Sequence, residues 1–247
     1  MSSPEDPSPI WSRPAPGERK PAHTRERIAE AALKIADAEG FEAVTMRRVA
    51  AELGAGTMTL YHYVKNKREL AALMDDTVMG ELLVPEDELG DDWREGLAQI
   101  ARRTYSSFMR HPWTFEFIGG EDDPGVGGPN ALRHVEQSLA AAEKTGLDLK
   151  GQFEITALMD DYVFGHAMRV RGIGRADQTP PERLDAMIAY MGQLLGTGEF
   201  PRLQAIAGDD LRAGFERVAE LATDPDRFER GLQTLLDGIE LMLSRGR

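Results

Sequence analysis

Helical periodicity is the feature of this sequence that most restricts its fold. Apolar residues recur three and four positions apart in one segment after another, as Ile28, Ala31, Ala32 and Ile35 do near the start of the chain. This spacing places side chains on one face of an α-helix, whereas a half-buried strand would alternate apolar and polar residues. The sequence contains no sustained alternation and no internal repeat, so it predicts an all-α protein.

Start and stop signals divide the chain into helices. Thr24 is a suitable N-cap for a helix that ends near residue 39, before Gly40. A second helix is expected at 45–53 and a short third one at about 56–63. Asn66 and Glu69 have capping-box spacing and begin a fourth helix. Further amphipathic stripes predict helices at 93–108, 132–142, 155–170 (ended by Gly172 and Gly174), 180–195 and 228–243.

Composition separates three regions. Residues 1–23 contain six prolines, which resist helix formation and cannot build a core, so we expect a flexible N-terminal arm. Four short helices fit residues 24–70, and residues 71–247 form a larger helical domain. The net charge is −13, yet residues 1–68 hold 11 Lys and Arg against 9 Asp and Glu, whereas residues 69–247 hold 18 against 33. This asymmetry favours a nucleic-acid partner for the first part of the chain.

Several classes of protein are excluded by what the sequence lacks. The chain has no cysteine, which rules out a disulfide scaffold, a thiolate metal site and a cysteine nucleophile. It has no apolar run near the roughly 20 residues that span a bilayer. Residues 1–9 do not have the pattern of a signal peptide. We expect a soluble, cytoplasmic protein with no membrane partner.

Residues 40–70 place a helix, a tight turn containing Gly54 and Gly56, and a short helix in succession. In a helix-turn-helix motif the first helix braces the second, whose exposed side chains enter the major groove of DNA. The stretch reads GFEAVTMRRVAAELGAGTMTLYHYVKNKREL. It resembles the DNA-binding domain of the TetR (tetracycline repressor) family almost position for position.

Two other segments extend this resemblance. The break Arg110-His-Pro-Trp113 and the closing stretch 231–238 are similar to the tetracycline-repressor-type C-terminal domain of the family. The segment Ile10-Trp-Ser-Arg-Pro14 is similar to the arms of members that repress antibiotic exporters. The resemblance implies an N-terminal helix-turn-helix domain of three helices, joined to a helical ligand-binding and dimerisation domain.

The resemblance also implies which residues contact DNA. Thr45 and Lys67 each begin a helix, where backbone N–H groups and the helix dipole favour a phosphate. Met58 departs from the family, because it has no hydrogen-bond donor and offers only packing against a thymine methyl group. The alternatives are simple capping, solvated charges and, for the arm, a disordered tail. The expected DNA-binding residues are Thr45, Arg47, Arg48, Thr57, Met58, Thr59, Tyr61, His62, Tyr63 and Lys67, together with Arg13, Arg19 and Lys20 of the arm.

The C-terminal domain is expected to hold a small-molecule inducer between its helices. The candidate lining is mostly aromatic and soft, which favours a flat, hydrophobic ligand, although each residue alone is compatible with ordinary core. In register with the tetracycline repressor, the drug-gripping positions fall on Leu83, Ile100 and Ile118, so tetracycline with magnesium is not the expected inducer. The candidates are Tyr105, Phe108, Trp113, Phe115, Phe117, His134, Met159, Asp160, Tyr162, Phe164, His166 and Met168.

A single reading helix recognises few bases, and helix-turn-helix proteins therefore bind paired half-sites as dimers. The stripes at 154–170 and 228–243 resemble the helices that pair between two copies in this family; the alternative is that both are intrachain core. We therefore expect a homodimeric transcriptional repressor that binds a palindromic operator and is released by a hydrophobic ligand. Control of antibiotic or metabolite export is compatible with this function.

Enzymatic constellations are not found in the sequence. It has no His-x-x-x-His pair and no phosphate-binding Gly-x-x-x-x-Gly-Lys motif. Asp160 and Asp161 point about 100° apart on a helix and do not make a shared acid–base pair. Residues 121–123 are acidic, but a solvated loop explains them better than a cation site. We expect no catalytic residue, no metal site and no cofactor. The remaining alternative is a ligand-independent or activating helix-turn-helix regulator controlled by a protein partner.

Overall fold

The computed structural model describes residues 9–14, 23–117, 127–176 and 179–245. Every regular element in these residues is a helix, which confirms the predicted all-α fold class. In chain order the elements are η1 (Ile10–Ser12), α1 (Arg25–Glu39), η2 (Phe41–Ala43), α2 (Met46–Glu52), α3 (Thr57–Tyr61), α4 (Lys67–Leu82), η3 (Glu86–Glu88), α5 (Trp93–Arg110), α6 (Thr114–Phe117), α7 (Pro129–Glu143), α8 (Leu149–Ala176), α9 (Pro181–Leu195), α10 (Pro201–Ala207), α11 (Leu211–Thr223) and α12 (Arg227–Arg245).

The chain forms two compact units, Met1–Val163 and Phe164–Arg247. The division falls inside α8. The boundary that the sequence predicts after residue 70 stays a prediction. The long helix α4 packs on α1 as well as on α5 and α7, so one continuous helix contacts both sets of helices.

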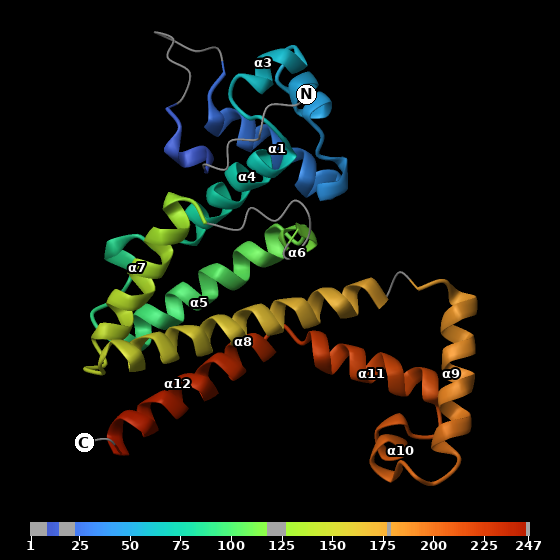
Figure 1. Cartoon of the computed structure of the whole chain (residues 1–247). Helices are drawn as coiled ribbons and strands as arrows, with labels where there is room; N and C mark the ends of the chain where they lie inside the picture. The colour runs from blue at the N-terminus through green and yellow to red at the C-terminus, as the bar shows by residue number, and fades with distance from the viewer. Residues whose placement is uncertain (1–8, 15–22, 118–126, 177–178, 246–247) are drawn as a thin grey trace. The chain divides into compact units, whose positions relative to one another are not determined.

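The first unit begins with a small helical bundle at residues 24–70, which we call the head (Figure 1). Within it α1 packs against α2 and α4, and α2 packs against α3. The apolar stripe of α1 and the inward residues of the later helices are fully buried together, among them Ile28, Val49, Leu60 and Leu70. Burial of these side chains supplies the main stabilisation of so small a bundle.

The predicted helix caps of the head are confirmed. The Thr24 hydroxyl accepts a hydrogen bond from Arg27 N at 3.3 Å. At the start of α4, Asn66 Oδ1 accepts from Glu69 N at 2.8 Å, and Glu69 Oε2 accepts from Lys65 N at 2.7 Å. Asn66 therefore caps the first turn of α4, and Glu69 reaches back to the residue before the N-cap, one position earlier than in the standard capping box.

The second half of α4 is bonded to α7. Asp76 is buried and accepts from Asn130 N at 2.7 Å, so that its carboxylate caps the first turn of α7. Burial raises the pKa of the Asp76 carboxyl. Gln137 of α7 both donates to Val84 O and accepts from Val84 N, at 2.7 and 2.9 Å, and Val84 lies two residues beyond the end of α4. These bonds hold α7 to α4 at both ends of their contact.

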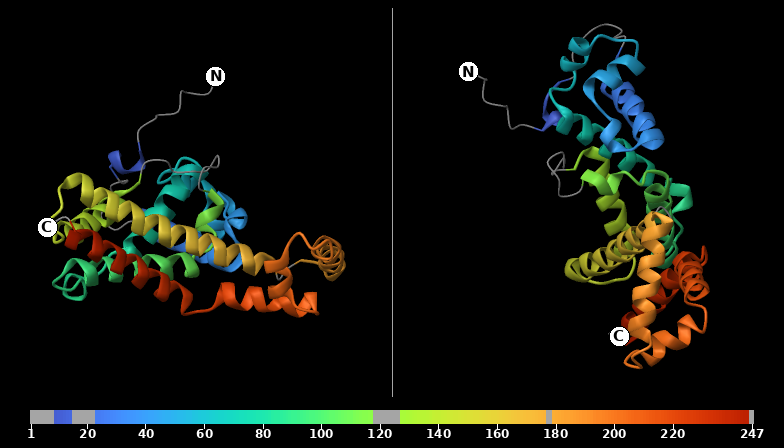
Figure 2. Two further views of the ribbon diagram at one scale, coloured as in Figure 1. Left: turned by 90° about the horizontal axis from the view of Figure 1, so that it is seen from below. Right: turned by 90° about the vertical axis from the view of Figure 1, so that its right-hand side faces the viewer.

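The second unit contains the end of α8 and helices α9 to α12, which Figure 2 shows from two sides. Helix α8 continues through Gly172 and Gly174 to Ala176, beyond the predicted end. A glycine inside a helix costs only about 1 kcal/mol relative to alanine, so it does not by itself end the helix. The sequence analysis also missed α10 and α11; α11 begins at Asp210, whose side chain accepts from Ala213 N at 3.1 Å.

Part of the predicted flexible arm is packed against the head. Ile10 is only 2% exposed and belongs to the core of the head, and Trp11 packs against the same core. Arg25 Nη1 donates to Ile10 O at 3.0 Å and to Arg13 O at 2.9 Å. The prolines on either side of this segment prevented a helical pattern in the sequence, but one short 3-10 turn is enough to bury an isoleucine.

Candidate functional site

Helix α3 turns one side chain into the head and the others outward. Leu60 is fully buried, whereas Met58 is 74% exposed and Tyr61 is 44% exposed. His62 follows as the C-cap and is exposed as well. The predicted outward residues at the centre of the short helix therefore lie on the surface of the head.

A tight turn fixes the angle between α2 and α3. Gly54 has a φ of 64°, a left-handed conformation that glycine adopts without steric strain. Ala55 N donates to Ala50 O at 2.9 Å and closes the turn. The turn residues therefore give α3 a defined orientation on α2.

The start of α2 presents the second group of predicted residues. Thr45, Arg47 and Arg48 are exposed. The Thr45 hydroxyl accepts from Arg48 N at 3.2 Å, and Arg48 Nη2 lies 2.5 Å from Glu39 Oε1. Arg47 makes no ion pair within the described residues, so it is the arginine whose charge is available at this surface.

Lys67 and Tyr63 each pack against another part of the head. The Lys67 ammonium lies 4.4 Å from the centroid of the Phe41 ring, a cation–π contact that fixes the side chain at the first position of α4. Tyr63 is half-buried and packs against the core of the head, unlike the outward position predicted for it. Thr57 and Thr59 are partly exposed on α3.

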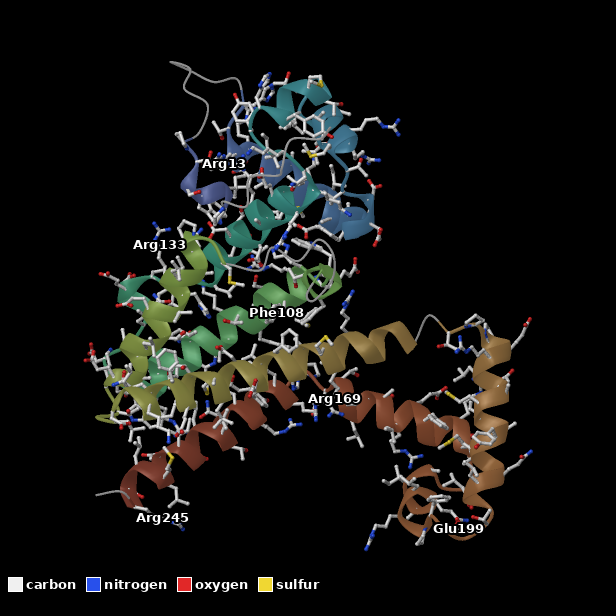
Figure 3. The ribbon with its side chains drawn as sticks, viewed as in Figure 1. Arg13, Phe108, Arg133, Arg169, Glu199 and Arg245 are labelled. Carbon is white, nitrogen blue, oxygen red and sulfur yellow. The ribbon has the colours of Figure 1, made fainter. Side chains whose placement is uncertain are left out.

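Of the three predicted arm residues, Arg13 lies within the described residues. Arg13 forms an ion pair with Glu69, whose carboxylate also accepts from Lys65 N before α4 (Figure 3). Its side chain is only 19% exposed. The structure thus engages Arg13 within the head. Arg19 and Lys20 lie outside the described residues.

A small cavity lies between α5, α7 and the first half of α8. It is narrow, and its interior admits about one water molecule. Two predicted ligand residues line it, Met159 and Asp160, beside the hydroxyl groups of Ser138 and Thr156. The lining is completed by Leu97, Ile100, Ala101 and Val163.

Asp160 is the most perturbed acid at this cavity. The residue is exposed to solvent on one side. The surrounding protein atoms nevertheless desolvate the carboxyl and raise its pKa, and the negative charge of Asp161 raises it further, to about 6. No ion pair of Asp160 is found within the described residues. The cavity therefore carries a carboxyl group that keeps its proton to a higher pH than an ordinary aspartate does.

Other predicted lining residues gather on α5 to α7. Burial raises the pKa of the Tyr105 hydroxyl and lowers that of the His134 imidazole, so His134 is neutral near pH 7. The rings of Phe108 and Phe115 lie 5.0 Å apart (Phe108 is labelled in Figure 3). The side chain of Phe117 lies outside the described residues.

Trp113 lies in the head core and not in the cavity. It is 2% exposed and belongs to the buried core of the head, with its ring stacked on Phe41 at a centroid distance of 6.2 Å. Its Nε1 donates to Asp37 Oδ1 at 2.6 Å. The proline after His111 ends α5 and turns the chain back onto the head, a tertiary contact that the aromatic composition of the segment did not reveal.

The remaining predicted ligand residues lie on α8. Tyr162 is half-buried, and in the second unit Phe164 and Met168 are exposed. His166 is buried, with its ring 5.4 Å from that of Phe228. Burial lowers the pKa of His166, and the charges of Arg227 and Arg169 lower it further. The predicted lining set is thus spread over the cavity, the head core and the second unit.

Neither a metal cluster nor a membrane-spanning helix is present in the part of the chain that the structure describes. No group of three His, Cys, Asp or Glu side chains there is placed to hold a metal ion. None of the described helices is long and apolar enough to cross a bilayer. The acidic residues 121–123 lie outside the described residues.

Comparison with known proteins places the chain in a family. Residues 28–74 match the bacterial regulatory proteins of the tetR family, and residues 84–243 match the tetracyclin repressor-like C-terminal domain. The chain is 36% identical to the HTH-type transcriptional repressor DrrR1 of Streptomyces coeruleorubidus over 246 residues, which cover 96% of this chain and 86% of DrrR1.

Solved structures with the same fold include ActR of Streptomyces coelicolor. Its apo structure has a TM-score of 0.65 and 27% identity, covering 92% of this chain and all of ActR. ActR in complex with actinorhodin has a TM-score of 0.64 and 28% identity, covering 91% of this chain and 96% of ActR. The exposed α3, the turn that holds it and the matched domains agree with one another: the chain belongs to the tetR family of bacterial regulatory proteins and carries the tetracyclin repressor-like C-terminal domain.

Proposed function

We propose that the chain is a transcriptional repressor that binds a palindromic operator as a homodimer and releases it when a hydrophobic small molecule binds. The observation that carries this proposal is the exposure of Met58, Tyr61 and His62 on α3, which is anchored by the fully buried Leu60. A short helix supported in this way is the form in which helix-turn-helix proteins enter the major groove.

The DNA-contacting surface in this proposal has two parts. Met58 and Thr57 face the bases, and Met58 selects a thymine methyl group by packing. Thr45, Arg47, Thr59, Tyr61 and Lys67 hold the phosphates, with Arg48 as a secondary contact once its exposed pair with Glu39 opens. Such an exposed pair is worth at most about 1 kcal/mol, so a phosphate can replace it.

Dimerisation is supported by apolar side chains that the second unit leaves uncovered. Phe164 and Met168 on α8, and Leu241 and Met242 on α12, are each more than one third exposed. Large apolar side chains left exposed on a surface mark protein interfaces where they gather. A second copy of the chain is the partner that a two-fold operator requires.

The cavity between α5, α7 and α8 is the ligand site in this proposal. ActR, which has this fold, was solved in complex with actinorhodin and with (S)-DNPA. Once the helices separate, the apolar lining of the cavity suits a flat ring system, and the Ser138 and Thr156 hydroxyls with Asp160 supply the few polar contacts. Because the cavity admits about one water molecule, ligand entry has to separate these helices, and that movement supplies the signal.

The narrow cavity also favours one other function. A regulator controlled by a protein partner needs no ligand cavity, and it needs an exposed apolar surface such as that of α9 to α11, where Tyr190 and Leu221 are at least 60% exposed. This alternative shares the DNA-binding surface and differs in what releases it.

A titration of a labelled DNA fragment from the region upstream of the chain's own gene tests the proposal. We expect specific binding that survives excess unrelated DNA, and displacement when actinorhodin is added as a flat aromatic probe. If a panel of flat aromatic compounds leaves the specific binding unchanged, the result would contradict release by such a ligand and favour the regulator controlled by a protein partner. Binding no tighter than to unrelated DNA would contradict both functions.

A further inference from the structure

Asp37 joins the head to the segment that follows α5. Near the end of α1, its Oδ1 accepts from Trp113 Nε1 at 2.6 Å and is 2.7 Å from His111 Nδ1. The two donors come from a single corner, residues 111–113, between α5 and α6. One carboxylate oxygen of the head is therefore bonded twice to a corner more than 70 positions away in the sequence.

His111 extends the connection to α4. Its Nε2 is 3.1 Å from Glu81 Oε2, and Arg110 Nη2 lies 3.0 Å from the same oxygen. The His111 side chain is only 8% exposed. Both ring nitrogens face carboxylate oxygens, one from α1 and one from α4. The charged groups facing the ring are Asp37 from α1, Glu81 from α4 and, through Glu81, Arg110 from α5.

The corner itself is fixed by its own backbone. His111 N donates to Ser107 O at 2.9 Å, and Thr114 donates to His111 O through both N and Oγ1, at 3.0 and 2.8 Å. A bonded corner of this kind moves as one piece with the end of α5. Any displacement of α5 is therefore transmitted to Asp37 and Glu81 together.

From the corner, packing leads to the candidate phosphate contacts. Trp113 stacks on Phe41, which is 3% exposed, and the Lys67 ammonium lies 4.4 Å from the same Phe41 ring. Phe41 begins the turn that precedes Thr45. Through Phe41, the corner is thus connected to Lys67 at the start of α4 and to the turn that precedes Thr45.

We propose that Asp37 is a positioning residue, through which the corner at residues 111–113 fixes the orientation of the head on α5 and α7 and so sets its fit to DNA. Asp37 itself touches no DNA in this proposal. The proposal rests on the proposed DNA-binding function for its consequence, but the positioning can be measured without DNA, ligand or dimer.

Two spin labels measure the orientation of the head directly. The native chain has no cysteine, so Ala51→Cys on α2 and Glu136→Cys on α7, both exposed, provide two unique attachment points in the first unit. Doubly labelled chains are diluted into unlabelled protein, and the intramolecular distance is measured by double electron–electron resonance. Asp37→Ala, Asp37→Asn and Trp113→Phe are compared with Glu30→Gln, an exposed carboxylate two turns earlier on α1.

We expect one narrow distance in the parent and in Glu30→Gln, and a distribution about twice as broad in Asp37→Ala. Asp37→Asn keeps an acceptor for Trp113, and Trp113→Phe keeps the stacking on Phe41. The distance distributions of both variants are therefore expected to be broader than that of the parent and narrower than that of Asp37→Ala. Affinity for the upstream DNA fragment should fall about tenfold in Asp37→Ala, the size of a lost charge-assisted hydrogen bond.

The outcomes separate positioning from a purely structural role. A distribution in Asp37→Ala as narrow as in Glu30→Gln would overturn the proposal. Broadening accompanied by loss of the head's helical circular dichroism would also overturn it, because Asp37 would then only maintain the fold. Should Asp37→Ala not fold, Asp37→Asn and Trp113→Phe carry the same test. A broadened distance in a chain that binds no specific DNA would leave the positioning intact and contradict the proposed function instead.

Discussion

At the scale of single residues, Lys67 illustrates how much a motif conveys. The sequence predicted that Lys67 begins a helix, and the structure confirms it as the first residue of α4. Its ammonium lies over the Phe41 ring. The cation–π partner could not be predicted, because Phe41 is far enough away in sequence that only the folded head brings the two together. The same holds for Tyr63, whose place in a family pattern gave no sign of its packing against the core.

The role of Lys67 leads to a prediction about salt dependence. We expect Lys67→Ala to weaken binding to the upstream DNA fragment and to lower the slope of log affinity against log salt by about one unit, because one phosphate contact is lost. Lys150→Ala removes the same charge from an exposed site on α8 that is 83% open, and it should leave the slope unchanged. Equal slopes in the two variants would remove Lys67 from the interface.

Trp113 carries the second prediction at this scale. Because it is buried in the head core, Trp113→Ala should destabilise the chain by about 3–5 kcal/mol, measured by urea unfolding, and should weaken DNA binding. A truncation confined to a ligand cavity would instead alter release and leave DNA binding intact. Phe115→Ala, two residues later and only half-buried, is the matched control and should lower the free energy of unfolding by less.

Asp160 predicts a pH dependence of stability. Its pKa is about 6 in the folded chain against an ordinary value of 3.8, so the folded state binds more protons than the unfolded state between these values. Stability from this group is therefore lost as the pH rises through that window, and the cost persists above it. Asp160→Asn should be more stable than the parent at pH 7.5, with the gain shrinking towards pH 4. A gain that does not vary with pH would contradict the assignment; Asp161→Asn, an exposed neighbour, should gain less.

At the scale of elements, the predictable parts are those with local signals. The first four helices follow from periodicity and caps, and the structure confirms them because their core is formed by that same periodicity. Helices α10 and α11 were missed although Asp210 caps α11, since Gly208 and the short length of α10 weakened the pattern. The end of α8 was placed too early, because the cost of two glycines is small against a helix of 28 residues.

The packed segment of the arm predicts a stabilising role for η1. Ile10→Ala should lower the free energy of unfolding by about 2–4 kcal/mol, because a buried isoleucine is replaced by a cavity. Ser12→Ala changes an exposed residue of the same turn and should have little effect. Thermal unfolding of the two variants compares them; identical melting temperatures would mean that the arm does not stabilise the head.

The contact between α4 and α7 leaves no room at Gly128. A methyl group added there would collide with the Asp76 carboxylate and with the Trp11 ring. Asp76 cannot move aside without breaking its bond to Asn130 N, so Gly128→Ala should destabilise the chain by about 1–3 kcal/mol. At Gly165 on α8 an added methyl group meets nothing within 4 Å, and Gly165→Ala should be neutral or slightly stabilising in the same urea titration.

At the scale of the whole molecule, charge is divided as a DNA-binding regulator requires. The acidic surplus lies after residue 68, where it opposes unspecific contact with DNA, while the head keeps near balance and exposes Arg47 beside α3. The sequence predicted this division, and it also predicted the helical class and the family. It did not predict that the corner after α5 enters the head, because nothing in residues 110–113 indicates which surface they cover.

Footprinting of the upstream DNA fragment with hydroxyl radicals, in the presence of the purified chain, tests the central claim most directly. Two protected half-sites related by two-fold symmetry, with centres about 34–36 Å apart or a multiple of that spacing, are the expected result, and Tyr61→Ala should weaken both equally. A single unpaired site, or protection no greater than on unrelated DNA, would contradict a homodimer that reads DNA through α3.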